Sequence, residues 1–291
     1  MSLLSERVYA NPRYSDLTDP KEKQKVLDEI TPEILAGLTA QQICDHTREV
    51  YDTTVQEYVN ENHNQGIIFD LAVFMNTVPQ GGRVLDVGCG VGRDALFMSC
   101  SDPEFRRELM NRTVNDKTVF DLCGYVPQRT FRVIAIDSSA EMLNFARSQE
   151  TELSKKCQDM KRVTFMLADM HQLGRLRFAN KFDGIFCCTS LLTHTPAELV
   201  KPSIESLSGL LNPGGVLFIS YTNGRATGIY DKLKLSQTGF IKYFSQPDPE
   251  VIEMLAERYS LKLERQTISD FEVGHVVKVK NLFVAQFFKK S

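Results

Sequence analysis

Residues 83–94, which read RVLDVGCGVGRD, restrict the possible folds of this chain more than any other segment. Val84, Leu85 and Val87 form an apolar run that is typical of a strand buried on both faces of a parallel sheet. The glycines at 88, 90 and 92 then permit a tight turn in which a ligand can approach bare backbone. Good helix formers follow at 94–98, so the segment predicts a strand, a glycine turn and a helix. This unit is the nucleotide-binding corner of a doubly wound α/β fold.

The charge next to the glycines indicates which nucleotide would bind. The dinucleotide fingerprint G-x-G-x-x-G needs its third glycine at position 93, where this chain has Arg93. Asp86 stands two residues before the first glycine, and its carboxylate would repel a pyrophosphate held at the following helix N-terminus. A ligand with an ammonium and a sulfonium group would instead be attracted. Asp86 therefore favours S-adenosylmethionine over NAD.

Residues 83–94 resemble motif I of the class I S-adenosylmethionine-dependent methyltransferases. Four later segments follow that family's order, so the resemblance covers about residues 45–289. The resemblance implies that Gly88, Cys89 and Gly90 pack on the adenosyl and methionyl parts of the cofactor. It also implies that Asp86 orients the methionyl ammonium.

Two further acids close the next two expected strands. Residues 131–137 form a strand that ends in Asp137, whose carboxylate can accept both ribose hydroxyls and resembles the family's ribose-binding acid. Ser138 and Glu141 fit a capping box that starts the next helix, and Met142 lies one turn into it, at the adenine edge or in the core. A third strand leads to Asp169 and Met170. The resemblance implies that Asp169 accepts a hydrogen bond from the adenine amino group and that Met170 packs on the ring.

The acceptor side is expected at residues 182–196, a fourth strand and the loop at its carboxyl end. By resemblance, backbone near Cys188 and Thr189 meets the methionyl part of the cofactor, while Ser190 and His194 face the acceptor. His194 has a side chain that titrates near neutral pH, so it is a candidate general base, with packing or loop hydrogen bonding as the alternative. A second capping box, Thr195 to Glu198, is expected to start the following helix.

Two tyrosines precede motif I on one predicted helix, which a capping box at Thr39 begins. Tyr51 and Tyr58 are seven residues apart and so share a helix face. Tyr51 is the candidate for closing over the methionyl end of the cofactor, as a tyrosine of this helix does in the family. The alternative is that both are packed aromatic residues.

The domain organisation predicted from these patterns has two parts. Residues 1–65 form an N-terminal arm and helical cap, with a loose arm over 1–20 and a short helix that Thr31 and Pro32 open. Residues 66–291 form the methyltransferase domain, a mostly parallel seven-stranded sheet that ends in an antiparallel hairpin from strands 261–268 and 281–288. Within it, Asp137 comes much later than the usual spacing of about 20 residues, so residues 100–130 contain an insertion.

The connection over residues 221–247 is aromatic and basic. Tyr221 and Tyr230 are candidates for binding the acceptor, because the family often places acceptor-binding groups there. This composition suits a planar or anionic acceptor, although a plain covering loop is equally consistent.

Composition narrows the class of partner. The net charge is −3, so the chain lacks the basic footprint of a nucleic-acid-binding protein. No apolar run approaches the roughly 18 residues of a membrane span, and the start lacks a signal core. The seven cysteines are scattered without C-x-x-C spacing, so neither a metal site nor a disulfide framework is indicated. We expect a cytoplasmic protein.

The sequence therefore predicts a methyltransferase that passes the methyl group of S-adenosylmethionine to oxygen or nitrogen of a small molecule, leaving S-adenosylhomocysteine. A non-catalytic protein that binds the cofactor or a partner is one alternative. An NAD-dependent oxidoreductase is another, against which Asp86 and the displaced third glycine argue.

Overall fold

The computed structural model describes residues 2–62, 69–111, 127–157, 160, 163–223, 228–236, 239–273 and 277–291. The side chains of residues 61, 62, 230 and 269–282 lie outside that description. No helix within these ranges is long and apolar enough to cross a membrane.

The described residues form a seven-stranded sheet in the order β3-β2-β1-β4-β5-β9-β8, together with a separate two-stranded hairpin, β6–β7. The strands of the large sheet are β1 (Arg83–Val87), β2 (Arg132–Asp137), β3 (Thr164–Leu167), β4 (Phe182–Cys188), β5 (Leu211–Thr222), β8 (Leu261–Val273) and β9 (Val277–Lys290). Strands β1 to β5 run parallel, and β9 is antiparallel to both β5 and β8. This is the predicted fold class.

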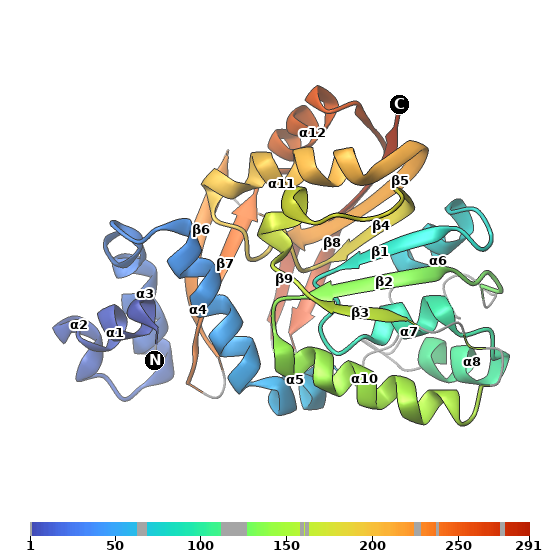
Figure 1. The fold of residues 1–291 in the computed structure, drawn as a ribbon. Coiled ribbons are helices and arrows are strands. Elements are labelled where there is room, and N and C mark those ends of the chain that lie inside the picture. Colours follow the sequence, from blue (N-terminus) through green and yellow to red (C-terminus); the bar gives the residue numbers. More distant parts are fainter. Residues whose placement is uncertain are drawn as a thin grey trace.

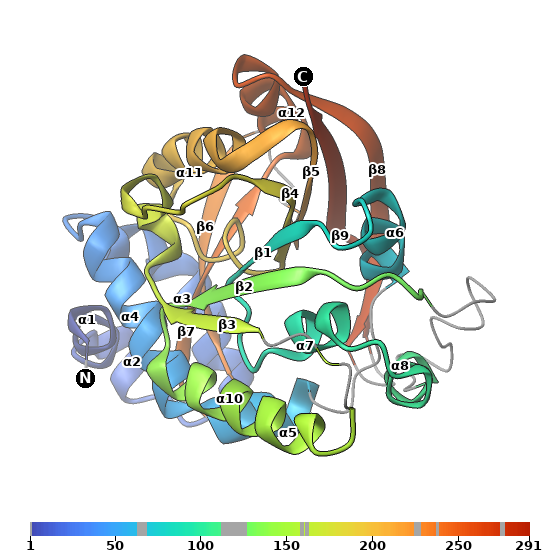
Figure 2. The same cartoon turned by 45° about the vertical axis from the view of Figure 1, so that its right-hand side comes forward.

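Alternating side chains of the sheet enter two separate cores. Val84, Ala135 and Phe218 point to one face, where α6 (Phe69–Thr77), α7 (Arg93–Ser99) and α8 (Pro103–Asn111) cover them. Leu85, Ile136 and Leu217 point to the other face, under η1 (Met170–Arg175), α11 (Ala197–Leu210) and α12 (Pro249–Arg258). Both faces are thus buried, which explains why the central strands read as continuous apolar runs. Figures 1 and 2 show the two helical layers on either side of the sheet.

The N-terminal residues form helices, so the prediction of a loose arm over residues 1–20 is wrong. Helices α1 (Leu3–Tyr9), α2 (Pro12–Ser15) and α3 (Pro20–Leu35) bury Leu4, Val8 and Tyr14 in a third core. The partner of these helices is the hairpin of β6 (Ile229–Leu235) and β7 (Ile241–Pro247), which supplies Leu233 and Ile241. Figure 1 shows these helices and the hairpin together at one side of the molecule. We call this unit, residues 2–35 with 229–247, the cap.

The prediction that Thr31 and Pro32 open a helix is also wrong. Thr31 and Pro32 lie inside α3 and do not open a new helix. The helix begins at Pro20, because Asp19 accepts hydrogen bonds from the backbone N–H groups of Lys21 and Glu22, and proline is favoured at the first helical position.

Helix α4 (Ala40–Thr53) connects the cap to the sheet, and α5 (Val55–Asn62) continues from it. The predicted capping box at Thr39 is present. Towards the cap, His46 Nε2 lies 2.8 Å from the Ile241 carbonyl oxygen of β7. Towards the sheet, Asp52 accepts a hydrogen bond from the Ser139 hydroxyl at 2.7 Å. Helix α4 therefore borders the carboxyl ends of the strands.

Two other capping predictions are wrong. Helix α10 (Ala140–Ser154) is capped by Ser139, whose hydroxyl accepts from the Met142 N–H, and not by Ser138. Helix α11 has no side-chain cap, because Thr195 donates its hydroxyl to the Leu191 carbonyl instead. Of the predicted insertion, residues 103–111 form α8, and residues 112–126 lie outside the described part of the chain.

Candidate functional site

The glycine turn after β1 is fastened to the end of β2. The N–H groups of Gly88 and Cys89 both donate to the Ile136 carbonyl, at 2.9 and 3.0 Å. The N–H of Gly90 donates to Asp137 Oδ2 at 2.8 Å. Gly88 has a φ of +69°, and a Cβ added to it would lie 2.4 Å from the Cβ of Ser190. Only glycine fits this position.

Asp86 lies under this turn as a buried carboxyl group, with 3% of its surface exposed. Its Oδ2 atom has no hydrogen-bond partner among the described residues. Burial, followed by the charges of Asp94 and Asp137, raises its pKa well above the ordinary range. A buried acceptor atom without a donor is costly, so this position fits a ligand that brings a cationic donor.

Asp137 holds the turn with both of its carboxylate oxygens. Oδ2 accepts from Gly90, and Oδ1 accepts from the Ser139 N–H at 2.9 Å. Burial raises the pKa of Asp137, and these backbone donors oppose the rise. Each carboxylate oxygen has a second lone pair, so Asp137 can still accept the two hydroxyls of a ribose.

Asp169 begins η1 and is engaged by neighbouring side chains. Its Oδ1 accepts from the His171 N–H at 2.9 Å and lies 3.0 Å from His171 Nδ1, while Oδ2 accepts from Gln172 at 2.9 Å. Burial would raise the pKa of Asp169, but the bonds from His171 and Gln172 outweigh it and lower the pKa to about 2. Asp169 therefore caps the start of η1, and its contact with adenine stays a prediction.

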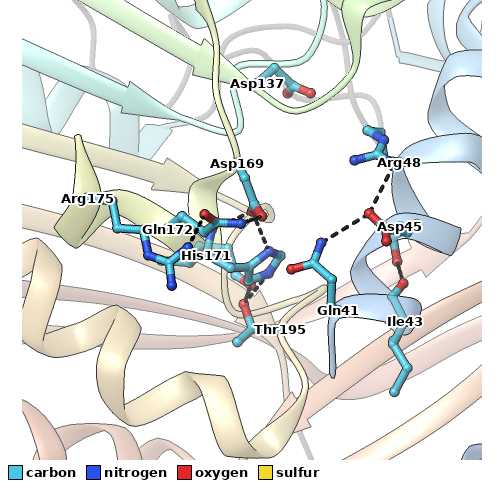
Figure 3. A network of polar contacts seen from close by, with 12 residues as sticks. Gln41, Ile43, Asp45, Arg48, Asp137, Asp169, His171, Gln172, Arg175 and Thr195 are labelled. Carbon is cyan, nitrogen blue, oxygen red and sulfur yellow. Dashed lines mark hydrogen bonds and ion pairs between the residues drawn. The ribbon is translucent and has the colours of Figure 1, made fainter. Parts of the chain in front are cut away.

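The two acids at the strand ends face helix α4. Figure 3 shows Asp137 and Asp169 across from Arg48 and Gln41. Both α4 residues contact Asp45, Arg48 at 3.0 Å and Gln41 at 3.1 Å. One wall of the site is therefore formed by the strand ends and the other by α4.

His194 is bonded through both of its ring nitrogens. Nδ1 lies 3.0 Å from the Tyr243 carbonyl oxygen, which can only accept, so Nδ1 carries the hydrogen. Nε2 then accepts from the Tyr51 hydroxyl at 2.9 Å. Burial lowers the pKa of His194 to about 4. A buried, neutral histidine with its free lone pair already occupied is a poor general base, so this geometry argues against that role and for the packing alternative.

Tyr58, more than Tyr51, lies against the glycine turn. A Cβ placed on Gly90 would be 3.5 Å from the Tyr58 hydroxyl oxygen. The Tyr51 ring packs edge-on against that of Tyr58, with 6.0 Å between centroids. The prediction of one helix carrying both tyrosines is wrong, because α4 ends at Thr53 and α5 begins at Val55, although the two rings are in contact. The role of Tyr51 over the cofactor stays a prediction.

Two candidate acceptor-binding residues are structural. Ser190 is buried and donates its hydroxyl to the Val87 carbonyl at the end of β1. Tyr221 is fully buried, and its hydroxyl donates to Gln286 at 2.7 Å. Both hydroxyls are directed to partners inside the protein, which argues against these two acceptor-binding predictions. The side chain of Tyr230 lies outside the described residues.

The remaining predicted cofactor residues gather near the turn. Met170 is buried, and its Sδ would lie 3.3 Å from a Cβ on Gly88. Met142 is buried in a small cluster beside Val91, which favours the core alternative for it. Thr189 follows Cys188 with a φ of +46°, and its N–H donates to Ser220. This strained residue stands at the carboxyl end of β4, where ligands meet such sheets.

The contacts of three other residues, Asp52, Arg93 and Asp94, were not predicted. Asp52 of α4 reaches the N-terminus of α10 through the Ser139 hydroxyl. Arg93 forms a two-point ion pair with Asp94 at 2.8 and 3.1 Å, at the position where a dinucleotide fingerprint would have glycine. In the sequence these residues are recognisable only as charged side chains, and local sequence patterns do not show which partner a charged side chain will contact.

A cavity of about 440 Å³ lies elsewhere, between α7, α8 and α10. Its lining includes Val91, Arg93, Glu108 and Leu153. It does not coincide with the strand ends, where the acids converge. Among the described residues, no cluster of three or more His, Cys, Asp or Glu side chains could hold a metal ion.

Comparison with known proteins gives consistent results. A family model described as a methyltransferase domain matches residues 120–215. The chain is 25% identical over 142 residues to the putative methyltransferase YqeM of Bacillus subtilis (strain 168). That match spans 48% of this chain and 42% of YqeM, so it covers less than half of either protein.

Solved structures show the same fold. One is the 1,6-didemethyltoxoflavin-N1-methyltransferase of Burkholderia thailandensis, solved with 1,6-didemethyltoxoflavin and S-adenosylhomocysteine. It matches with a TM-score of 0.56 and 14% identity, over 87% of this chain and 91% of that one. The glycopeptide N-methyltransferase MtfA, complexed with S-adenosylmethionine, matches with a TM-score of 0.53 and 13% identity, over 78% of this chain and 95% of that one.

Proposed function

We propose that this chain belongs to the class I S-adenosylmethionine-dependent methyltransferases and that it transfers a methyl group from S-adenosylmethionine to oxygen or nitrogen of a small-molecule acceptor. The observation that carries this proposal is Asp86, a buried carboxyl with an unpartnered oxygen beneath a glycine turn. A cationic ligand relieves that cost, whereas a pyrophosphate would increase it.

We assign the cofactor contacts residue by residue. Asp86 would meet the methionyl ammonium, and Asp137 the ribose hydroxyls. The backbone of Gly88, Cys89 and Gly90 would lie against the cofactor, and Ser138, Met170, Cys188 and Thr189 would border it. Asp169 would receive the adenine amino group on its open side, since its lone pairs are only partly used.

When bound, S-adenosylmethionine supplies a methyl group on a positively charged sulfur. The protein needs no nucleophile of its own for an in-line transfer, only groups that align the acceptor and exclude water. Tyr58 packs against Gly90 of the glycine turn. The Tyr51 ring packs against Tyr58, and its hydroxyl is hydrogen-bonded to His194. The two tyrosines therefore shape the space above the turn, where an acceptor would lie.

A small-molecule acceptor agrees with the charge and the architecture. The net charge of −3 provides no footprint for a nucleic acid. The 1,6-didemethyltoxoflavin bound in the Burkholderia thailandensis structure is a small molecule, which supports the same class of acceptor here. We further propose that residues 1–65, together with the β6–β7 hairpin, cover the acceptor side of the site, and that the rest of residues 66–291 forms the cofactor-binding domain.

Thermal unfolding with added ligands tests the proposal. S-adenosylmethionine and S-adenosylhomocysteine should raise the melting temperature, and NAD should not. Asp137→Ala should abolish the rise. Asp248→Ala is the matched control, because Asp248 also accepts a backbone N–H, at 3.0 Å, but on α12 far from the turn. Stabilisation by NAD alone would overturn the proposal. Stabilisation by S-adenosylhomocysteine without labelled-methyl transfer to any metabolite pool would favour a non-catalytic binding protein.

A further inference from the structure

The contacts of Asp169 leave its carboxylate with one free acceptor position. An ionised carboxyl group offers four lone pairs, two on each oxygen. Oδ1 accepts twice, from the backbone N–H of His171 at 2.9 Å and from the ring Nδ1 of the same residue at 3.0 Å. Oδ2 accepts from Gln172 Nε2 at 2.9 Å. In the part of the chain that the structure describes, one lone pair of Oδ2 is therefore left for a ligand.

The His171 ring is held in place from its far side. Its Nε2 atom lies 3.1 Å from the hydroxyl oxygen of Thr195, a fully buried residue whose hydroxyl donates to the Leu191 carbonyl. The His171 side chain is 6% exposed, against 24% for the side chain of Asp169. The ring is thus fixed behind the carboxylate, whereas the carboxylate keeps exposed surface that a ligand can reach.

The other side-chain donor to Asp169 is also held. Arg175 Nη1 donates to Gln172 Oε1 at 3.0 Å, and this bond directs the amide nitrogen of Gln172 to Asp169. Figure 3 shows the resulting chain of polar contacts around Asp169, which ends at Arg175 on one side and at Thr195 on the other. Because the donors are fixed, the direction of the free lone pair is set before a ligand binds.

We propose that His171 is a positioning residue that makes the adenine site specific for a purine with an amino group at carbon 6. The amino group of adenine donates a hydrogen, which the single free acceptor of Asp169 satisfies. The oxo group of hypoxanthine can only accept, so it would face the carboxylate with no hydrogen between them.

The His171 ring also excludes a water molecule that would weaken this specificity. Without the ring, the second lone pair of Asp169 Oδ1 would be open to water. Such a water could donate to a 6-oxo group and bridge it to the carboxylate, so that the wrong base would bind almost as well as adenine. The inference rests on the proposed methyltransferase function and deepens it, because it names the residue that selects the base of the cofactor.

Two ligands that differ only at carbon 6 of the purine test the proposal on the intact chain. S-adenosylhomocysteine carries the amino group, and S-inosylhomocysteine carries an oxo group in its place. Their dissociation constants are measured by isothermal titration calorimetry. We expect the unmodified protein to bind the adenosyl compound at least about tenfold more tightly, because the oxo compound leaves a charged acceptor unpaired.

Histidine variants separate the contact with Asp169 from the packing of the ring. His171→Phe keeps a ring but removes both nitrogens, and should reduce the preference to about threefold or less. His171→Asn, whose side-chain amide can donate to Oδ1 in place of Nδ1, should keep most of the preference. His46→Phe is the matched control, because His46 is also buried and bonded through both ring nitrogens, to Ser2 and Ile241 on the side of the cap. It should keep the full preference.

Three outcomes would overturn the proposal. They are equal binding of the two compounds by the unmodified protein, an unchanged preference in His171→Phe, and weakening of both compounds by the same factor in that variant, as a purely structural ring predicts. If thermal melts show that His171→Phe does not fold, Thr195→Val takes its place. It frees the far side of the ring and should lower the preference, and an unchanged preference would again count against the proposal. Failure of the unmodified protein to bind S-adenosylhomocysteine would instead refute the proposed function.

Discussion

Replacing Gly88 by alanine tests whether the glycine turn is shaped by sterics as described. Two independent costs arise at this position. The backbone has a φ of +69°, in the left-handed region, where a residue with a Cβ loses roughly 1–2 kcal/mol. The new Cβ would also lie 2.4 Å from the Ser190 Cβ, and forcing such contacts in a packed site typically costs roughly 1–3 kcal/mol.

The two costs sum to about 2–5 kcal/mol of lost unfolding free energy. With about 2–4 °C of melting temperature per kcal/mol for a protein of this size, Gly88→Ala should melt about 4–20 °C lower. It should also fail to bind S-adenosylhomocysteine, because Ser190 or the turn must move.

Two further variants separate the backbone cost of Gly88→Ala from its steric cost. Gly81→Ala is the control for the backbone, since Gly81 has a φ of +72° but nothing within 4 Å of its added Cβ. It should lose only about 1–2 kcal/mol. Combining Gly88→Ala with Ser190→Gly removes the clash, so a double-mutant cycle by urea unfolding should give a favourable coupling of roughly 1–3 kcal/mol. If Gly88→Ala costs no more than Gly81→Ala, or if the cycle shows no coupling, the steric argument is wrong.

Three further predictions concern titratable groups. Asp86→Asn should be more stable than the unmodified protein at neutral pH, with the advantage shrinking as the pH falls toward the ordinary aspartate pKa. The raised pKa of folded Asp86 means that its charged form costs stability, so an unchanged urea midpoint would refute this. Asp169→Asn should lose at most about 2 kcal/mol at pH 7, because the pKa of folded Asp169 is about 2, and this loss should shrink between about pH 4 and 2. A loss that does not change with pH would contradict it. Burial lowers the pKa of His194 to about 4, so the turnover rate should not fall as the pH is lowered from about 8 to 6. A fall in this range that disappears in His194→Phe would show that the histidine does act as a base.

The fold and the cofactor corner were predictable because their signals are local. The run before Gly88, the glycine spacing and the acid at Asp137 each depend on a few consecutive residues, and all lie where they were expected. Strand identity follows from burial on both faces, which apolar runs report directly.

The errors arise where tertiary contacts decide the outcome. Ser138 and Ser139 both fit a helix cap in sequence, and Ser139 caps α10, where its hydroxyl also donates to Asp52. Tyr221 looked like an acceptor-binding residue, but its partner Gln286 comes from a strand that begins 56 residues later, at Val277. His194 looked like a base until the Tyr243 carbonyl and the Tyr51 hydroxyl occupied its two nitrogens. None of these partners can be found by reading a short window.

The shared core of the cap has a consequence for synthesis of the chain. Leu4, Val8 and Leu27 are translated early, yet they are buried with Leu233 and Ile241, more than 200 positions later. Until the ribosome has delivered the hairpin, these first helices have nowhere to bury their apolar side chains. Helices α1 to α3 are therefore made well before they can reach their final packing, and during that interval they are a natural target for chaperones.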